Sequence, residues 1–183
     1  MKAIELAKKI LSNRDFQELL DALRLLNQKN DKRVYNLYAD ILGDFISLYS
    51  YDEFVDFSNE LTINETIFIF GFLWMKKHCI QIGGYEEEVQ GMINSFAESK
   101  VTNIGFTRLA LSGTDIFTDF DGEDNFMDYV AQLNQEISSF GKEIIVFFND
   151  TYSACSFCML ILDADIVKTI MSEWDDDTMI IHK

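Results

Sequence analysis

Lys142-Glu143-Ile144-Ile145-Val146-Phe147-Phe148 is a run rich in β-branched and aromatic side chains, which is typical of a strand. Asn149-Asp150-Thr151 follows as a turn, and Ser153–Leu162 is a second strand-like run. Two such runs separated by a short turn predict a β-hairpin. We therefore expect an antiparallel sheet to form around residues 142–162.

The segments on either side of this hairpin carry helical signals. A helix is predicted over residues 124–140, and Gly141 is a natural end for it because glycine adopts the left-handed conformation without steric cost. Downstream, Asp163 or Asp165 is expected to cap a helix that runs to Trp174. Thr178–His182 is predicted to form a short terminal strand.

The central part of the sequence alternates between strand-like and helical segments. Residues 66–73 are so uniformly apolar that a buried strand and a buried helix are both compatible with them. We predict a strand over 74–82 and a helix from Tyr85 to about Ser99. A further strand, Ile104–Leu111, precedes a turn region from Ser112 to Gly122.

The first sixty residues are predicted to be helical, because apolar residues recur at spacings of three and four. Ser12 or Asn13 is a candidate cap for the second helix, since a short oxygen-bearing side chain accepts a hydrogen bond from an exposed helix N–H. A third helix is expected over Lys32–Leu48 and a short fourth over Tyr51–Leu61.

Helices followed by strands with packing helices indicate an α+β fold. We expect an N-terminal helical layer (residues 1–62) followed by a mixed core (residues 63–183) with a mostly antiparallel sheet of four to six strands. The two parts are expected to form one compact domain, because 183 residues are enough to bury a substantial core.

Negative charge is concentrated in the mixed core. The formal net charge is −16, yet residues 1–50 contain eight Lys and Arg against seven Asp and Glu, which leaves −17 on residues 51–183. A charge of this size attracts cationic partners and repels phosphates. Direct nucleic-acid binding is therefore not expected, and a basic protein is the expected partner.

The sequence predicts a cytoplasmic protein outside the membrane. Charges interrupt the N-terminus too often for a signal peptide. The longest apolar run, Ile67–Met75, is far shorter than the roughly 20 residues that span a bilayer. Three cysteines without a secretory signal indicate reduced thiols.

An acidic and aromatic segment at residues 115–124 is the candidate partner-binding site. Carboxylates alternate there with aromatic side chains, which commonly anchor interfaces. A calcium loop counted from Asp119 fails, because Asp124 replaces the required glycine and Val130 the bidentate glutamate. The alternative is a solvated turn whose last two carboxylates favour the next helix's N-terminus. The candidate residues are Asp115, Phe117, Asp119, Phe120, Asp121, Glu123 and Asp124.

The cysteines are predicted to be core residues. Cys155 and Cys158 have the spacing of zinc and redox sites, but no second pair exists and the other soft donors are only Cys79 and two histidines. His78 and Cys79 are adjacent, and neighbours on a strand point to opposite faces, so they cannot share a proton. We therefore expect no catalytic residue, no metal and no cofactor.

The order of elements from Phe70 to Trp174 resembles a family of small acidic bacterial proteins of uncharacterised function. The residues that carry the likeness are the passage Ile80-Gln81-Ile82-Gly83-Gly84-Tyr85-Glu86-Glu87, the helix Phe126–Ile137, and the hairpin Ile144–Leu162 with Asp150 and Tyr152. Gly83-Gly84-Tyr85 stands where that family has a tryptophan. In charge and size the chain is also similar to immunity proteins, which neutralise basic nuclease toxins.

These observations lead to three functional hypotheses. The first is a non-enzymatic acidic protein that binds a basic partner protein, such as a toxin-immunity or inhibitor protein. The second is a small-molecule enzyme that depends on carboxylates or a metal, and the third is a structural or scaffold component. The sequence leaves the oligomeric state open.

Overall fold

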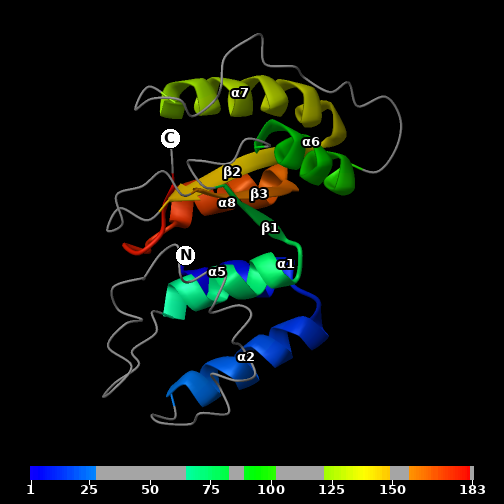
Figure 1. Ribbon diagram of the computed structural model, residues 1–183. Coiled ribbons are helices and arrows are strands. Elements are labelled where there is room, and N and C mark those ends of the chain that lie inside the picture. The colour runs from blue at the N-terminus through cyan, green and yellow to red at the C-terminus, as the bar shows by residue number, and fades with distance from the viewer. Residues whose placement is uncertain (28–64, 83–88, 102–121, 149–156, 182–183) are drawn as a thin grey trace.

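The computed structural model describes residues 1–27, 65–82, 89–101, 122–148 and 157–181, and the statements below refer to those residues (Figure 1). They form six α-helices, one 3-10 helix and a four-stranded sheet. Helices precede the sheet and its neighbouring strands are all antiparallel. The predicted α+β class is confirmed.

The sheet is built on the predicted hairpin. β2 (Lys142–Phe148) and β3 (Phe157–Asp163) pair antiparallel along their whole length. β1 (Cys79–Ile82) pairs with β3, and β4 (Ile180–Ile181) pairs with β2. The strand order β1-β3-β2-β4 makes β1 and β4 the two edges of the described sheet.

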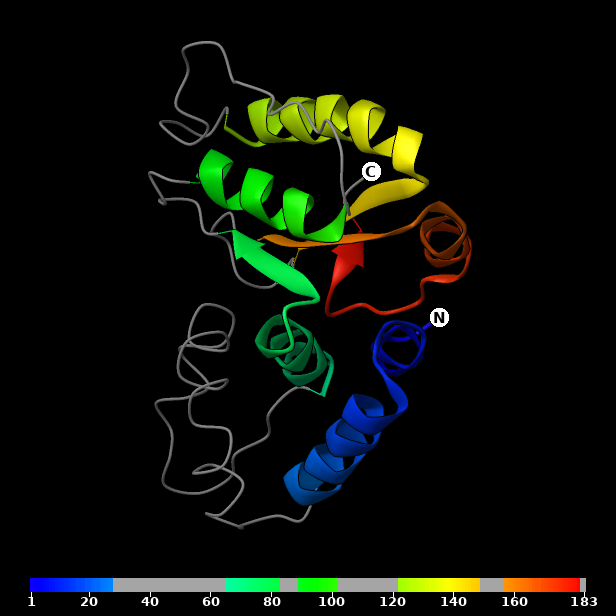
Figure 2. The ribbon, with the colours of Figure 1, turned by 90° about the vertical axis from the view of Figure 1, so that its right-hand side faces the viewer.

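Helices lie on both faces of this sheet (Figure 2). Ile145 and Leu160 belong to the hydrophobic cluster on one face, whereas Ile144 and Ile161 belong to the cluster on the other. Successive residues of a strand point to opposite faces, so a strand that is covered on both sides needs apolar residues throughout. This accounts for the lack of polar alternation in both hairpin strands.

The first face packs against α1 (Ala3–Ile10), α5 (Glu65–Met75) and α8 (Ala164–Glu173), while α2 (Asn13–Asn27) lies farther away against α1 and α5. Every residue of α5 from Ile67 to Leu73 is buried, which is typical of a helix inside the core. The ambiguous run 66–73 is therefore helical. No described helix is long and apolar enough to cross a membrane.

The second face packs against α6 (Val89–Lys100) and α7 (Gly122–Ile137), which the 3-10 helix η3 (Ser138–Phe140) extends. A buried hydrogen bond of 2.6 Å, donated by the Tyr129 hydroxyl to Asn94 Oδ1, joins the two helices. The chain then turns at Gly141, whose φ of 70° confirms the predicted stop.

Two helix starts illustrate the predicted capping. Ser12, not Asn13, caps α2, because its Oγ accepts a hydrogen bond of 3.1 Å from the backbone N–H of Asp15. Asp163 precedes α8, as expected, but makes no side-chain cap hydrogen bond. Its carboxylate instead accepts a 2.7 Å hydrogen bond from Lys142, the residue directly opposite it in the hairpin. Cross-strand charge attraction draws the carboxylate away from the helix end.

The predicted strand over 74–82 is wrong for its first half. α5 continues through Met75, and the backbone N–H groups of Lys77 and His78 donate to the carbonyls of Trp74 and Leu73, both at 2.8 Å. This helix end needs a left-handed residue, usually glycine, and Lys77 takes that place with φ 61°. The conformation costs a non-glycine residue about 1–2 kcal/mol. The strand begins only at Cys79.

Several predicted segments fall outside the described residues. α6 is described only from Val89, and β4 is shorter than its predicted range, with residue 182 not described. The segments outside the description are the helices Lys32–Leu48 and Tyr51–Leu61, the strand Ile104–Leu111, most of the turn Ser112–Gly122, and the hairpin turn at 149–151.

Candidate functional site

Most of the predicted partner-binding segment lies outside the described residues. This applies to positions 115, 117, 119, 120 and 121. Glu123 and Asp124 are in the first turn of α7, which begins at Gly122. The involvement of the segment in binding stays a prediction.

The described cysteines are core residues. Cys79 and Cys158 are buried on the same face of the sheet, and their positions on the paired strands are diagonal, since Cys79 is opposite Leu160 and Cys158 opposite Gln81. The Cys79 thiol donates to the carbonyl of Phe70. Burial, with a smaller contribution from Cys158, raises the pKa of Cys79 well above its ordinary value. A protonated buried thiol is a poor nucleophile, whereas Cys155 lies outside the described residues.

His78 lies in the turn that precedes β1, not on the strand as predicted, and it is half-buried. Burial and the nearby Lys100 ammonium lower the pKa of His78, with a smaller opposing effect from Asp15. Within the described ranges, no three His, Cys, Asp or Glu side chains gather closely enough to hold a metal ion.

A groove lies beside the edge strand β1, between the end of α5 and α6. Its volume is about 330 Å³, within the range of small-molecule sites. Trp74, Ile80, Met92 and Phe96 give it an apolar lining, and the buried Cys79 also borders it. The polar lining residues are Lys77, Ser95 and Ser99.

Lys77 lines this groove, and Lys100 contacts two of its lining residues. The ammonium of Lys100, at the end of α6, donates a 2.7 Å hydrogen bond to the carbonyl of Lys77. It also lies 5.2 Å from the ring centroid of Phe96, which is within cation–π range. Burial lowers the pKa of Lys100, and the charge of Lys142 acts in the same direction. Lys77 and Lys100 make no ion pair with any described carboxylate.

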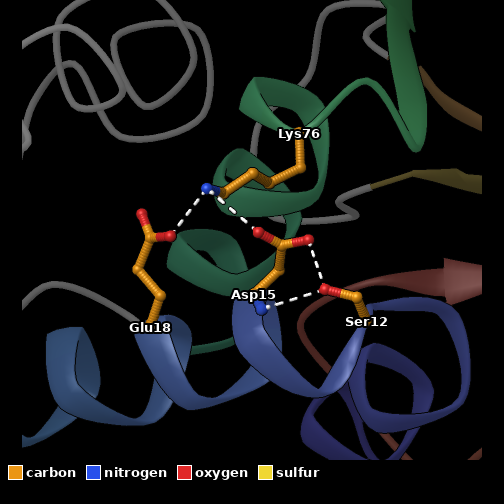
Figure 3. A network of polar contacts seen from close by, with 4 residues as sticks. All are labelled: Ser12, Asp15, Glu18 and Lys76. Atoms are coloured by element: carbon orange, nitrogen blue, oxygen red, sulfur yellow. Dashed lines mark hydrogen bonds and ion pairs between the residues drawn. The ribbon is translucent and has the colours of Figure 1, made fainter.

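Lys76 contrasts with its neighbour Lys77. The ammonium of Lys76 lies 2.8 Å from Glu18 Oε2 and 3.4 Å from Asp15 Oδ1, so it ties α5 to α2 (Figure 3). Asp15 is held in place by Ser12, whose hydroxyl donates to Asp15 Oδ2 at 2.6 Å. That hydrogen bond is the main cause of the lowered pKa of Asp15, and the bond to Glu18 raises the pKa of Lys76. This network is a structural connection between two helices.

An acidic segment, residues 163–177, runs from the last residue of β3 through α8 to the chain that leads into the edge strand β4. It contains six carboxylates and one lysine, Lys168. Asp176 is held by hydrogen bonds of 2.8 Å from Thr66 Oγ1 and 3.0 Å from the Thr178 N–H. The exposed carboxylates are Asp163, Asp165, Glu173, Asp175 and Asp177.

Aromatic packing anchors the acidic segment to the core. The Trp174 ring lies 4.8 Å from the ring of Phe147, centroid to centroid, and its Nε1 donates to the carbonyl of Met179 at 2.7 Å. The N–H of Asp175 also donates to the carbonyl of Met1 at 2.9 Å. The carboxylates are therefore displayed on a fixed backbone.

The fold and these two regions define an α+β protein with helices on both faces of an antiparallel sheet. No protein-family model, curated protein or solved structure matches the chain.

Sequence reasoning missed the groove. Its two lysines are 23 positions apart, and only the pairing of β1 with the core brings α6 beside the end of α5. The one available signal was Lys76-Lys77-His78, a basic run directly after an apolar helix. The sequence predicted a strand over 74–82, and in a strand the neighbouring side chains of this run would point to opposite faces. The run was therefore not recognised as a cluster of cations.

Proposed function

We propose that the protein is a non-enzymatic acidic binding protein whose partner is a basic protein. The observation that carries the proposal is the exposed acidic segment 163–177, in a region of the chain with a formal charge of −17. Charge of one sign on a fixed surface accelerates association with a partner of the opposite sign. Capture of a basic nuclease toxin by a bacterial cytoplasmic immunity protein is the biological form we propose.

The acidic segment suits this role because its backbone is anchored while its carboxylates remain in water. Exposed carboxylates lose little hydration until the partner arrives, so they act mainly on the association rate and its salt dependence. Affinity then requires apolar anchors near the centre of the interface. We propose that Phe117 and Phe120 of the predicted segment 115–124 supply such anchors.

The test begins with affinity capture from cell extract at low and high salt, followed by binding measurements with the purified partner. We expect a basic protein that is recovered at low salt and lost at high salt. Replacing three exposed carboxylates, as Asp165→Asn, Glu173→Gln and Asp177→Asn, is expected to slow association and flatten its dependence on salt.

A charge-matched control replaces three exposed carboxylates elsewhere, as Asp21→Asn, Glu98→Gln and Asp128→Asn. Both variants change net charge by the same amount, so only a located binding surface separates them. Equal association rates for the two variants would remove segment 163–177 from the interface. Recovery of an acidic partner, or recovery independent of salt, would contradict the proposed function.

A further inference from the structure

Two lysines of a strongly acidic chain meet beside the edge strand β1, and neither has a carboxylate partner among the described residues. The sequence has 31 Asp and Glu against 15 Lys and Arg. Within the described part of the chain, Lys76, Lys142 and Arg24 are ion-paired, whereas the other cations are not. Lys77 and Lys100, at the groove beside β1, form no ion pair within the described part of the chain, although Lys100 is partly buried.

The ammonium of Lys100 is positioned with donors to spare. A lysine ammonium has three N–H donors, and the carbonyl of Lys77 takes one of them at 2.7 Å. The same contact holds Lys100 above the ring of Phe96, which lines the groove. Lys77 itself lines the groove from the left-handed position at which glycine is usual.

The rest of the groove is apolar. Trp74 projects from the last turn of α5, Ile80 from β1, and Met92 and Phe96 from α6. Among the described residues no carboxylate lines the groove, and the polar lining side chains other than Lys77 are the hydroxyls of Ser95 and Ser99. An apolar lining with cationic groups at one side is complementary to a molecule with an apolar body and a single anionic group.

We propose that this groove binds a small carboxylate with an apolar body, whose carboxylate is held by Lys77 and Lys100 and whose body lies against Trp74, Ile80 and Phe96. A carboxylate accepts from both ammonium groups, and charge-assisted hydrogen bonds of this kind are among the strong ones. The net charge of −16 repels highly charged anions most, which selects a monoanion over a polyphosphate or nucleic acid. The site is independent of the proposed basic partner.

The experiment compares two probes with the same ten-carbon chain, decanoate with an anionic head group and 1-decanol with a neutral one, by calorimetric titration of the full chain below the solubility limit of each. Decanoate is expected to bind with one-to-one stoichiometry, and decanol about tenfold more weakly or worse. The double variant Lys77→Gln, Lys100→Gln is expected to lose about tenfold in decanoate affinity and to leave the binding of decanol unchanged.

Two further variants keep the result interpretable. Lys168→Gln removes one exposed lysine from α8 and is expected to leave decanoate affinity unchanged. Lys77→Gly removes the groove cation while placing glycine at the left-handed position, so it is expected to keep the melting temperature and still weaken decanoate binding.

Several results would overturn the proposal. They are equal affinity for decanoate and decanol, retention of decanoate affinity in a folded Lys77→Gly or double variant, and absence of decanoate binding to the unmodified chain. A loss of affinity in Lys168→Gln as large as in the double variant would also reject the site, since it would mark a general effect of net charge.

Discussion

Among the described residues, the surroundings of the two edge strands differ in charge. Lys77 lines an apolar groove beside β1 and the ammonium of Lys100 contacts its carbonyl, and neither lysine has a described carboxylate partner. Residues 163–177, which lead into β4, display five exposed carboxylates around an aromatic anchor. The net charge of −16 has the sign of this second region only. The net charge of the whole chain therefore does not reveal the two lysines that the tertiary structure brings together beside the groove.

The lysines show how position decides what a charge does. Lys76 directly follows the last residue of α5, and its ammonium forms ion pairs with Glu18 and Asp15 of α2. Lys77, one residue later, adopts the left-handed conformation that turns the chain towards β1, and it lines the groove. Adjacent residues of the same type thus serve a structural contact and a candidate binding site.

The largest expected effect breaks the anchor of the acidic segment. Phe147 is fully buried, lies opposite Ile181 of β4, and contacts the rings of Phe70 and Trp174 at centroid distances of 5.0 and 4.8 Å. Phe147→Ala is expected to lower the free energy of unfolding by about 3–5 kcal/mol, because it removes buried contacts and leaves a cavity. Urea denaturation measures this.

The matched control is Phe140→Ala in η3, since Phe140 is 37% exposed. It is expected to cost well under half as much, because water already reaches the ring. A similar loss for both variants would mean that the cluster of Phe70, Phe147 and Trp174 does not anchor the acidic segment.

A smaller effect separates Lys76 from Lys77. Lys76→Met removes the cation that joins two carboxylates of α2 to α5, and we expect a loss of up to about 1 kcal/mol, the upper range for partly exposed ion pairs. Lys77→Met is expected to leave stability unchanged, because no ion pair is lost. The measurement is thermal or urea unfolding at low salt. An equal loss in both variants would contradict the distinction.

The network of Ser12, Asp15 and Lys76 also makes stability depend on pH in the acid range. The pKa of Asp15 is lowered in the folded protein, chiefly by the hydrogen bond from Ser12. Its contribution to stability is therefore present above the unfolded pKa of about 4 and is lost as pH falls below it. Ser12→Ala is expected to reduce the loss of stability between about pH 4 and pH 2. An unchanged acid-unfolding profile would count against the network.

The smallest expected effect is at His78. Burial and Lys100 lower the pKa of His78, so protonation of the folded protein is disfavoured. The folded state is then stabilised fully above the unfolded pKa of about 6.5, and this stability is lost as pH falls from there towards the lowered folded value. NMR titration is expected to give His78 a pKa below the ordinary value, with an upward shift in Lys100→Gln. A downward shift would exclude the influence of Lys100.

The sequence predicted the centre of the fold well and its edges less well. The runs around Ile145 and Leu160 were predicted correctly as strands because β-branched and aromatic residues dominate both. Gly141 marks the turn before them, because glycine adopts a positive φ without steric strain. The sequence did not predict the end of α5, because Lys77 takes the left-handed position at which a glycine usually marks a helix end. The cap at Asp163 depended on its cross-strand neighbour Lys142, which becomes visible only once the register is known.

The candidate sites follow the same division. The acidity of residues 163–177 is local in sequence, although the sequence-based prediction placed the binding site at 115–124 instead. The groove combines residues from α5, β1 and α6 that no sequence spacing connects. Segment 115–124 was singled out by its alternation of carboxylates and aromatics, and its role in binding remains a prediction.

The most direct test of the two-edge account is one amide NMR experiment with two probes, decanoate and an octalysine peptide. Decanoate is expected to shift the signals of residues 77–80 and 95–100, and octalysine those of residues 163–177, with little overlap. The two probes together would then define separate anionic-ligand and basic-partner surfaces. Shifts at the same residues for both probes, or shifts spread evenly over the chain, would contradict the account.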